Sequence, residues 1–133
     1  MNRDLLAAIC RRAGERCEYC LVPRFAFPLP FQIDHIIAEK HGGQAVEENL
    51  ALACPHCNRF KGPNIAGIDP ETGEITRLYN PRTDIWSKHF RSAGATLIGT
   101  TPIGRTTVNV LRMNGDDLLR IRVELLAEGG GAF

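Results

Sequence analysis

Two pairs of cysteines have the spacing of a metal site. Cys17 and Cys20 form one C-x-x-C pair, and Cys54 and Cys57 form a second pair after the segment 21–53. Each pair folds into a tight turn that directs two thiolates at one ion, and two such turns complete a tetrahedral shell with no open position. We therefore predict a structural Zn²⁺ bound by these four cysteines. A disulfide, a redox-active C-x-x-C and buried thiols are the alternatives that the spacing leaves open.

An acid and an imidazole lie between the two cysteine pairs. Residues 33–37 read Ile-Asp-His-Ile-Ile. Asp34 and His35 are costly in the middle of an Ile-rich strand unless they are used. Considered alone, the two residues are explained by a hydrogen bond between them or by a strand that faces solvent.

The order of the motifs from Cys17 to Gly62 is more specific than any one of them. It runs C-x-x-C, D-H-I, G-G, N-L and C-x-x-C-N-x-x-K-G. In this order the sequence resembles the HNH nuclease family, whose fold is the ββα-metal or His-Me finger. The resemblance covers roughly a third of the chain. The N-P-R, W-x-x-H-F and T-P-x-G-R segments of the remainder are similar to one bacterial subgroup of the family.

The resemblance implies a metal-dependent HNH endonuclease that hydrolyses DNA phosphodiester bonds. His35 would be the general base that activates water, because imidazole can be neutral near pH 7. Asp34 and Asn58 would give oxygen ligands to one divalent cation, Mg²⁺ or Mn²⁺, separate from the zinc. Many members have His where Asn58 stands, and an amide is a weaker ligand for soft transition metals. Asn49 would complete the catalytic set by hydrogen-bonding backbone in the loop and fixing the orientation of His35.

Four further residues are weaker candidates. Arg59 and Lys61 follow the last cysteine, and the family pattern places the lysine near the phosphate backbone of nucleic acid. Two solvated charges are the alternative. His56 lies inside the second cysteine pair, where it faces the metal, contacts phosphate or is simply exposed. His41, beside the glycine turn, is expected to face solvent, and contact with substrate is the alternative.

These motifs require a small set of elements to position them. We expect one α+β domain over residues 1–133, in which a small ββα-metal (HNH) finger is held together by the four-cysteine zinc site. The expected parts are an N-terminal helix at 2–13, the finger core at 17–62, a loop-rich connection at 63–101, a C-terminal helical extension at 102–127 and a flexible tail at 128–133. Because the short hairpin and one-turn helix of the finger bury little apolar surface, we expect metal binding to supply folding free energy. Arg122 and other arginines of the C-terminal helices are interpreted as side chains whose charges reach solvent.

Composition limits the function classes. The 133 residues are 44% hydrophobic and carry a formal net charge of +1, so any nucleic-acid contact must come from local patches. The longest apolar run near the N-terminus, 5–10, is too short for a membrane span or a secretory signal, and we expect a cytoplasmic protein without a membrane partner. Five cysteines are an odd number, which fits a disulfide framework poorly, and Cys10 is interpreted as a core residue.

Two function hypotheses remain. The first is the HNH endonuclease acting on DNA. The second is a non-catalytic zinc-stabilised module that binds nucleic acid or a partner protein. A zinc scaffold needs only the four cysteines and has no use for Asp34, His35 and Asn58, so their presence favours the enzyme. The oligomeric state is open.

Overall fold

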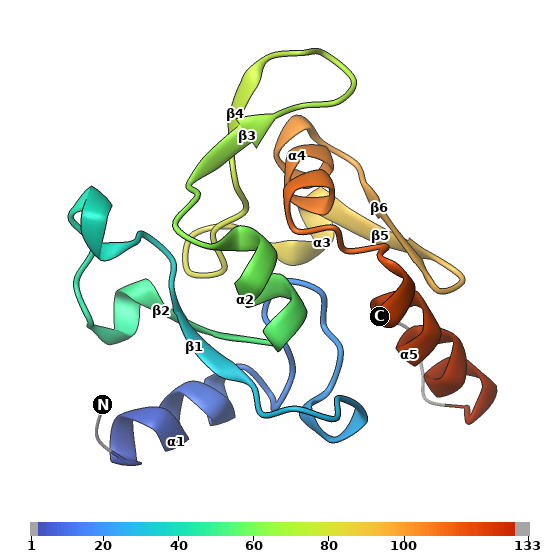
Figure 1. The fold of residues 1–133 in the computed structure, drawn as a ribbon, viewed down its shortest axis with the longest axis horizontal. Coiled ribbons are helices and arrows are strands. Elements are labelled where there is room, and N and C mark those ends of the chain that lie inside the picture. The colour runs from blue at the N-terminus through green and yellow to red at the C-terminus, as the bar shows by residue number, and fades with distance from the viewer. Residues whose placement is uncertain (1–2, 130–133) are drawn as a thin grey trace.

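The computed structural model describes residues 3–129 (Figure 1). In chain order its helices and strands are α1 (Arg3–Arg12), β1 (Gln32–His35), β2 (Leu50–Ala53), α2 (Pro55–Lys61), β3 (Ala66–Ile68), β4 (Ile75–Arg77), α3 (Trp86–His89), β5 (Phe90–Ala93), β6 (Thr96–Gly99), α4 (Pro102–Val110) and α5 (Asp116–Ala127). Within the described residues the strands pair as three separate antiparallel hairpins, β1-β2, β3-β4 and β5-β6. The predicted α+β class is confirmed. Residues 130–133 of the expected tail lie outside the described residues.

The β1-β2 hairpin and α2 form the ββα unit. β1 and β2 are in register so that Asp34 lies opposite Ala51 and His35 lies opposite Leu50. Successive side chains of a strand point to opposite faces, and β2 is buried on both. One face packs against α1 through Leu50 and Leu52, and the alanines of the other face pack in the core that contains the cysteines. The strand therefore sits between the N-terminal helix and the metal site.

Helix α2 begins directly after β2, and its start is specified by two neighbouring residues. Cys54 is the N-cap, with extended backbone and a side chain that accepts a hydrogen bond from the Cys57 N–H. Pro55 takes the first helical position, where the missing N–H costs nothing. The helix ends at Lys61, because Gly62 turns the chain with a φ of 49°.

Helix α1 covers the outer face of β2. Ile9 and Cys10 are its buried residues, and both pack in the cluster that contains Leu50 and Leu52. The expectation that Cys10 is a core residue is therefore confirmed. The Arg12 guanidinium at the end of the helix donates to the backbone carbonyl of Leu50, which ties α1 to the hairpin.

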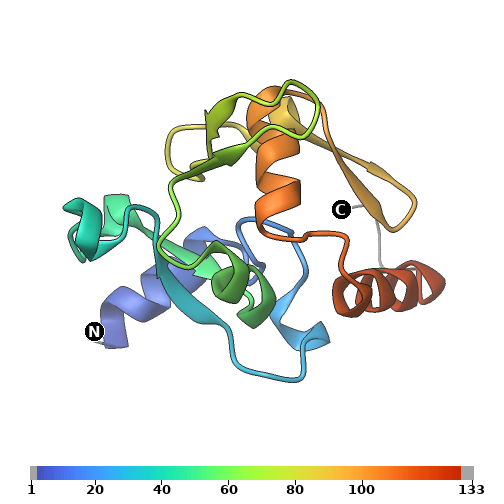
Figure 2. The same ribbon diagram turned by 45° about the horizontal axis from the view of Figure 1, so that its top comes forward.

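The C-terminal half packs around α4. The segment 63–101 contains four short strands and one helical turn. Figure 2 shows α4 between the β3-β4 hairpin and the β5-β6 hairpin. The backbone of α4 lies so close to that of His89 that position 104 must be glycine, because a Cβ on Gly104 would lie 1.9 Å from the carbonyl oxygen of His89. Within the expected helical extension at 102–127, α4 ends at Val110 and α5 begins at Asp116. No helix among residues 3–129 is long and apolar enough to cross a membrane.

Candidate functional site

The four paired cysteines converge on one point. Their Sγ atoms all lie within 4.8 Å of one another, and all four side chains are buried. The Sγ atoms of Cys20 and Cys54 are 3.8 Å apart. A tetrahedron with Zn–S bonds of about 2.3 Å has an edge of about 3.8 Å, so this spacing suits zinc. None of the cysteines in residues 3–129 forms a disulfide. The predicted four-cysteine cluster is confirmed, and its geometry is compatible with structural Zn²⁺.

Each pair has the same internal hydrogen bond. The N–H of Cys20 donates to Sγ of Cys17 at 3.5 Å, and the N–H of Cys57 donates to Sγ of Cys54 at 3.3 Å. Donors of this kind favour the thiolate form of the accepting sulfur, which is the form that binds a metal. Both cysteine pairs therefore have the backbone hydrogen bonds that favour metal binding by their first cysteine.

Arg122 on α5 is buried near the cysteine cluster, which sequence reasoning did not foresee. Its side chain is 0% exposed and donates to the carbonyls of Ala95 and Met113 and to Oδ1 of Asn114. Within the described residues its Nη1 has no hydrogen-bond partner. Burial lowers the pKa of Arg122, and the negative charges of the cysteine cluster oppose that effect. A zinc ion with four thiolates carries a net charge of −2, so a buried guanidinium fits this position.

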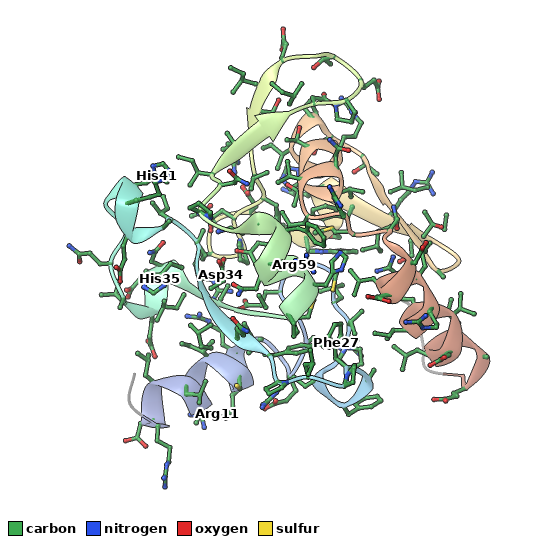
Figure 3. The ribbon with its side chains drawn as sticks, viewed as in Figure 1. Arg11, Phe27, Asp34, His35, His41 and Arg59 are labelled. Atoms are coloured by element: carbon green, nitrogen blue, oxygen red, sulfur yellow. The ribbon has the colours of Figure 1, made fainter. Side chains whose placement is uncertain are left out.

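Asp34 lies on the side of β1 that faces α2 and is only 5% exposed (Figure 3). The Tyr19 hydroxyl donates to its Oδ2 at 2.6 Å. The Lys61 ammonium lies 3.1 Å from Oδ2 and 3.3 Å from Oδ1. Burial raises the pKa of Asp34, and the Lys61 charge and the Tyr19 hydroxyl oppose part of the rise. Sequence reasoning missed Tyr19, although its place inside the first cysteine pair puts it beside the finger core.

His35 follows Asp34 and is partly open to solvent, with 28% of its side chain exposed. Its Nε2 atom is buried and has no hydrogen-bond partner among residues 3–129. The nearest acid that pairs with it is Glu39, whose Oε1 is 3.8 Å from Nε2. A buried ring nitrogen without a partner is unusual, because buried polar atoms are normally hydrogen-bonded. In the part of the chain that the structure describes, Nε2 therefore has no hydrogen bond that a water molecule or a substrate atom would have to displace.

Asn49 holds together the loop that follows β1. Its Oδ1 accepts from the Ile37 N–H at 2.8 Å, and its Nδ2 donates to the carbonyls of Ile37 and Gln44, both at 2.9 Å. Gly43 makes this possible, since a Cβ there would lie 1.7 Å from the Ile37 oxygen. The effect of this loop on the orientation of His35 stays a prediction.

Asn58 projects from the first turns of α2 and is half-buried. Its Nδ2 donates to Oε1 of Gln32 at 2.7 Å, which joins the helix to the start of β1. Among the described residues no hydrogen bond engages its Oδ1. The amide oxygen is thus free, whereas the carboxylate oxygens of Asp34 are both engaged.

The weaker candidates take different environments. Lys61, expected near phosphate, is only 2% exposed and points into the finger. Arg59 is exposed, with its guanidinium 5.3 Å from the centre of the Phe60 ring. His56 lies with Nε2 2.7 Å from the Arg112 carbonyl oxygen, so it packs on the connection between α4 and α5. His41 is exposed on the loop after β1 (Figure 3).

Comparison with known proteins agrees with this arrangement. Over 114 residues the chain is 26% identical to the Septu protein PtuB of Bacillus thuringiensis, and the match covers 84% of this chain. The chain spans 42% of the length of that curated relative. No solved structure matches. Residues 17–64 match the HNH endonuclease family. The matched segment includes the four cysteines, Asp34 and His35.

Proposed function

We propose that this chain is a metal-dependent endonuclease that hydrolyses DNA phosphodiester bonds, with His35 as the general base. The observation that carries the proposal is the unpartnered, buried Nε2 of His35 beside Asp34 on the first strand of an HNH domain. The HNH family is generally one of nucleases, and a general base is what a water nucleophile requires.

In this mechanism His35 accepts a proton at Nε2 from the attacking water. Asn49 acts through the loop that it closes and keeps the strand end in place. Asp34 and Asn58 are the residues that would hold a divalent cation, Mg²⁺ or Mn²⁺, because hard cations prefer oxygen ligands. When bound, such an ion stabilises negative charge on the phosphoryl group. The donor types fit this role, and the amide oxygen of Asn58 is free.

Binding to DNA is proposed to rest on a few local cations, since the net charge is only +1. Arg59 is exposed on α2 and is the candidate that the structure leaves accessible. Contacts to phosphate carry no sequence information, so we expect weak sequence selectivity and strong dependence on salt. A zinc site of four cysteine thiolates is typical of a reducing compartment, so we propose that the protein is cytoplasmic.

A second candidate function is a zinc-stabilised module that binds nucleic acid or protein without cleaving. The observation that favours it is the engagement of Asp34, whose two oxygens are held by Tyr19 and Lys61. A carboxylate in a closed ion pair is what a purely structural role would produce.

Plasmid cleavage separates the two functions. Zinc-loaded protein is incubated with supercoiled plasmid and Mg²⁺ or Mn²⁺, beside His35→Ala and the surface control Lys88→Ala. Removing a general base typically lowers the rate by roughly 10²–10⁴, so we expect His35→Ala to lose cleavage while circular dichroism, zinc content and DNA binding stay like those of wild type. If His35→Ala cuts as fast as Lys88→Ala, the assigned base is wrong and the non-catalytic module is favoured.

A further inference from the structure

Lys61 is bound as completely as a lysine can be. An ammonium has three N–H donors. Those of Lys61 are directed at the Asp34 carboxylate, at the His35 carbonyl oxygen 3.1 Å away and at the Ile36 carbonyl oxygen 3.0 Å away. With 2% of the side chain exposed, no donor is left for a phosphate. Lysine is seldom buried unless it is paired, so this arrangement calls for a reason.

We propose that Lys61 is the resident cation of Asp34, and that Asp34 can ligate a divalent cation only after the Lys61 ammonium has left it. This inference rests on the proposed role of Asp34 as a metal ligand. It adds that the Lys61 ammonium and a divalent cation compete for the same carboxylate, that of Asp34.

Two physical facts prevent the Lys61 ammonium and a divalent cation from binding Asp34 at the same time. A lysine ammonium and a divalent ion at the same carboxylate repel each other, and the repulsion is strong where water is excluded. Both Asp34 oxygens are also already taken, because Tyr19 donates to one and Lys61 approaches both. Removal of Lys61 without a replacement would leave a buried, uncompensated carboxylate, so the lysine also neutralises Asp34 while no divalent ion is bound.

The structure offers Lys61 space into which its side chain can move. A cavity of about 200 Å³ adjoins the lysine. Apolar side chains form most of its wall, and Asn64, Asn80 and Arg77 contribute polar groups, although the Arg77 guanidinium is already paired with Asp84. Lys61 is the last residue of α2 and precedes Gly62, so its side chain starts from the end of the helix. A flexible four-carbon stem can therefore carry the ammonium away from Asp34 and through this cavity toward Asn64 and Asn80. Once released, the same ammonium has donors free for a phosphate.

The test is Mn²⁺ binding to the zinc-loaded chain, followed by isothermal titration and by electron paramagnetic resonance. Lys61→Met removes the charge and keeps an unbranched side chain, and Lys88→Met makes the same change at an exposed lysine on α3. The apparent affinity of a site is reduced by the fraction of time for which it is competent. We expect Lys61→Met to bind Mn²⁺ at least about tenfold more tightly than Lys88→Met. Lys61→Gln, which keeps a donor for the strand carbonyls, gives the same comparison should the methionine variant not fold.

Wild-type protein supplies an independent measurement. Amine acylation followed by mass spectrometry should leave Lys61 unmodified without Mn²⁺ and modify it at saturating Mn²⁺, while Lys88 reacts equally in both. Equal Mn²⁺ affinity in the Lys61 and Lys88 variants would overturn the proposal, as would a Lys61 that stays protected when Mn²⁺ is bound. Absence of Mn²⁺ binding in every variant also overturns it. These readouts do not use cleavage, so tighter Mn²⁺ binding in an inactive protein would retain this inference and reject the nuclease.

Discussion

Asn49→Ala tests whether the loop after β1 is held by one side chain. The substitution removes three hydrogen bonds, from the Ile37 N–H to Oδ1 and from Nδ2 to the carbonyls of Ile37 and Gln44. The freed backbone groups lie near the surface and can be hydrated, so each bond falls toward the lower end of the usual net range of about 0.5–1.5 kcal/mol. We expect a loss of about 2 kcal/mol in the free energy of unfolding.

The same number predicts a melting shift. Unfolding entropy is about 2.1 cal/mol/K per residue, which for 133 residues gives about 0.28 kcal/mol/K. A loss of about 2 kcal/mol then lowers Tm by about 7 °C. Because Ile37 is two residues beyond His35, we also expect plasmid cleavage to fall by roughly 10–100-fold, since misplacement of a catalytic group by about 1 Å can cost that much.

The assay pairs differential scanning calorimetry with plasmid cleavage, and Asn109→Ala is the matched control. Asn109 is exposed on α4, and none of the hydrogen bonds described for residues 3–129 involves its side chain. Zinc content should be unchanged in both variants. A Tm for Asn49→Ala within about 2 °C of the control, or undiminished cleavage, refutes the idea that this side chain fixes the loop.

Two other predictions concern stability. Cys54→Ser keeps an oxygen that can cap α2 but removes one thiolate, so we expect the variant to lose zinc and its cooperative thermal unfolding. The control Cys10→Ser should retain zinc. Zinc is measured by atomic emission, and full zinc occupancy in Cys54→Ser would contradict the four-cysteine site. Hydrogen bonds from Arg105 hold the pKa of Asp69 at about 2, so its contribution to stability is present above about pH 4 and is lost as pH falls toward 2. The Tm difference between wild type and Asp69→Asn, set against exposed Asp117→Asn, should be full at pH 6 and shrink below pH 4; a difference independent of pH would count against the pair.

The part of the site that the sequence predicted is the part encoded by local spacing. A C-x-x-C turn directs two sulfurs by its own backbone, so two such turns in one finger identify the ligands without knowledge of the fold. The register that sets Asp34 opposite Ala51 is not encoded in this local way, because segment 36–49 separates the two strands and β2 is buried on both faces.

The environment of the charged residues was not predictable in the same way. Arg122 and Lys61 lie on helices where charged residues usually reach solvent, and nothing in their local sequence marks them as buried. Each is buried because groups outside its own helix meet it, the carbonyl oxygens of Ala95 and Met113 for the arginine and the Asp34 carboxylate for the lysine. Tertiary contacts override helix amphipathicity at both positions.

Tyr19 links the zinc site to the proposed catalytic strand. It lies between Cys17 and Cys20, its hydroxyl donates to Asp34 at 2.6 Å, and its carbonyl accepts from Nε1 of Trp86 at 2.8 Å. Loss of zinc would therefore release the first cysteine pair and with it a donor that positions Asp34. Inhibition by a chelator then has two sources, removal of the structural ion and removal of a divalent ion from Asp34. Only a chelation experiment in which zinc stays bound, checked by metal analysis of the same sample, can assign the lost cleavage to the second ion.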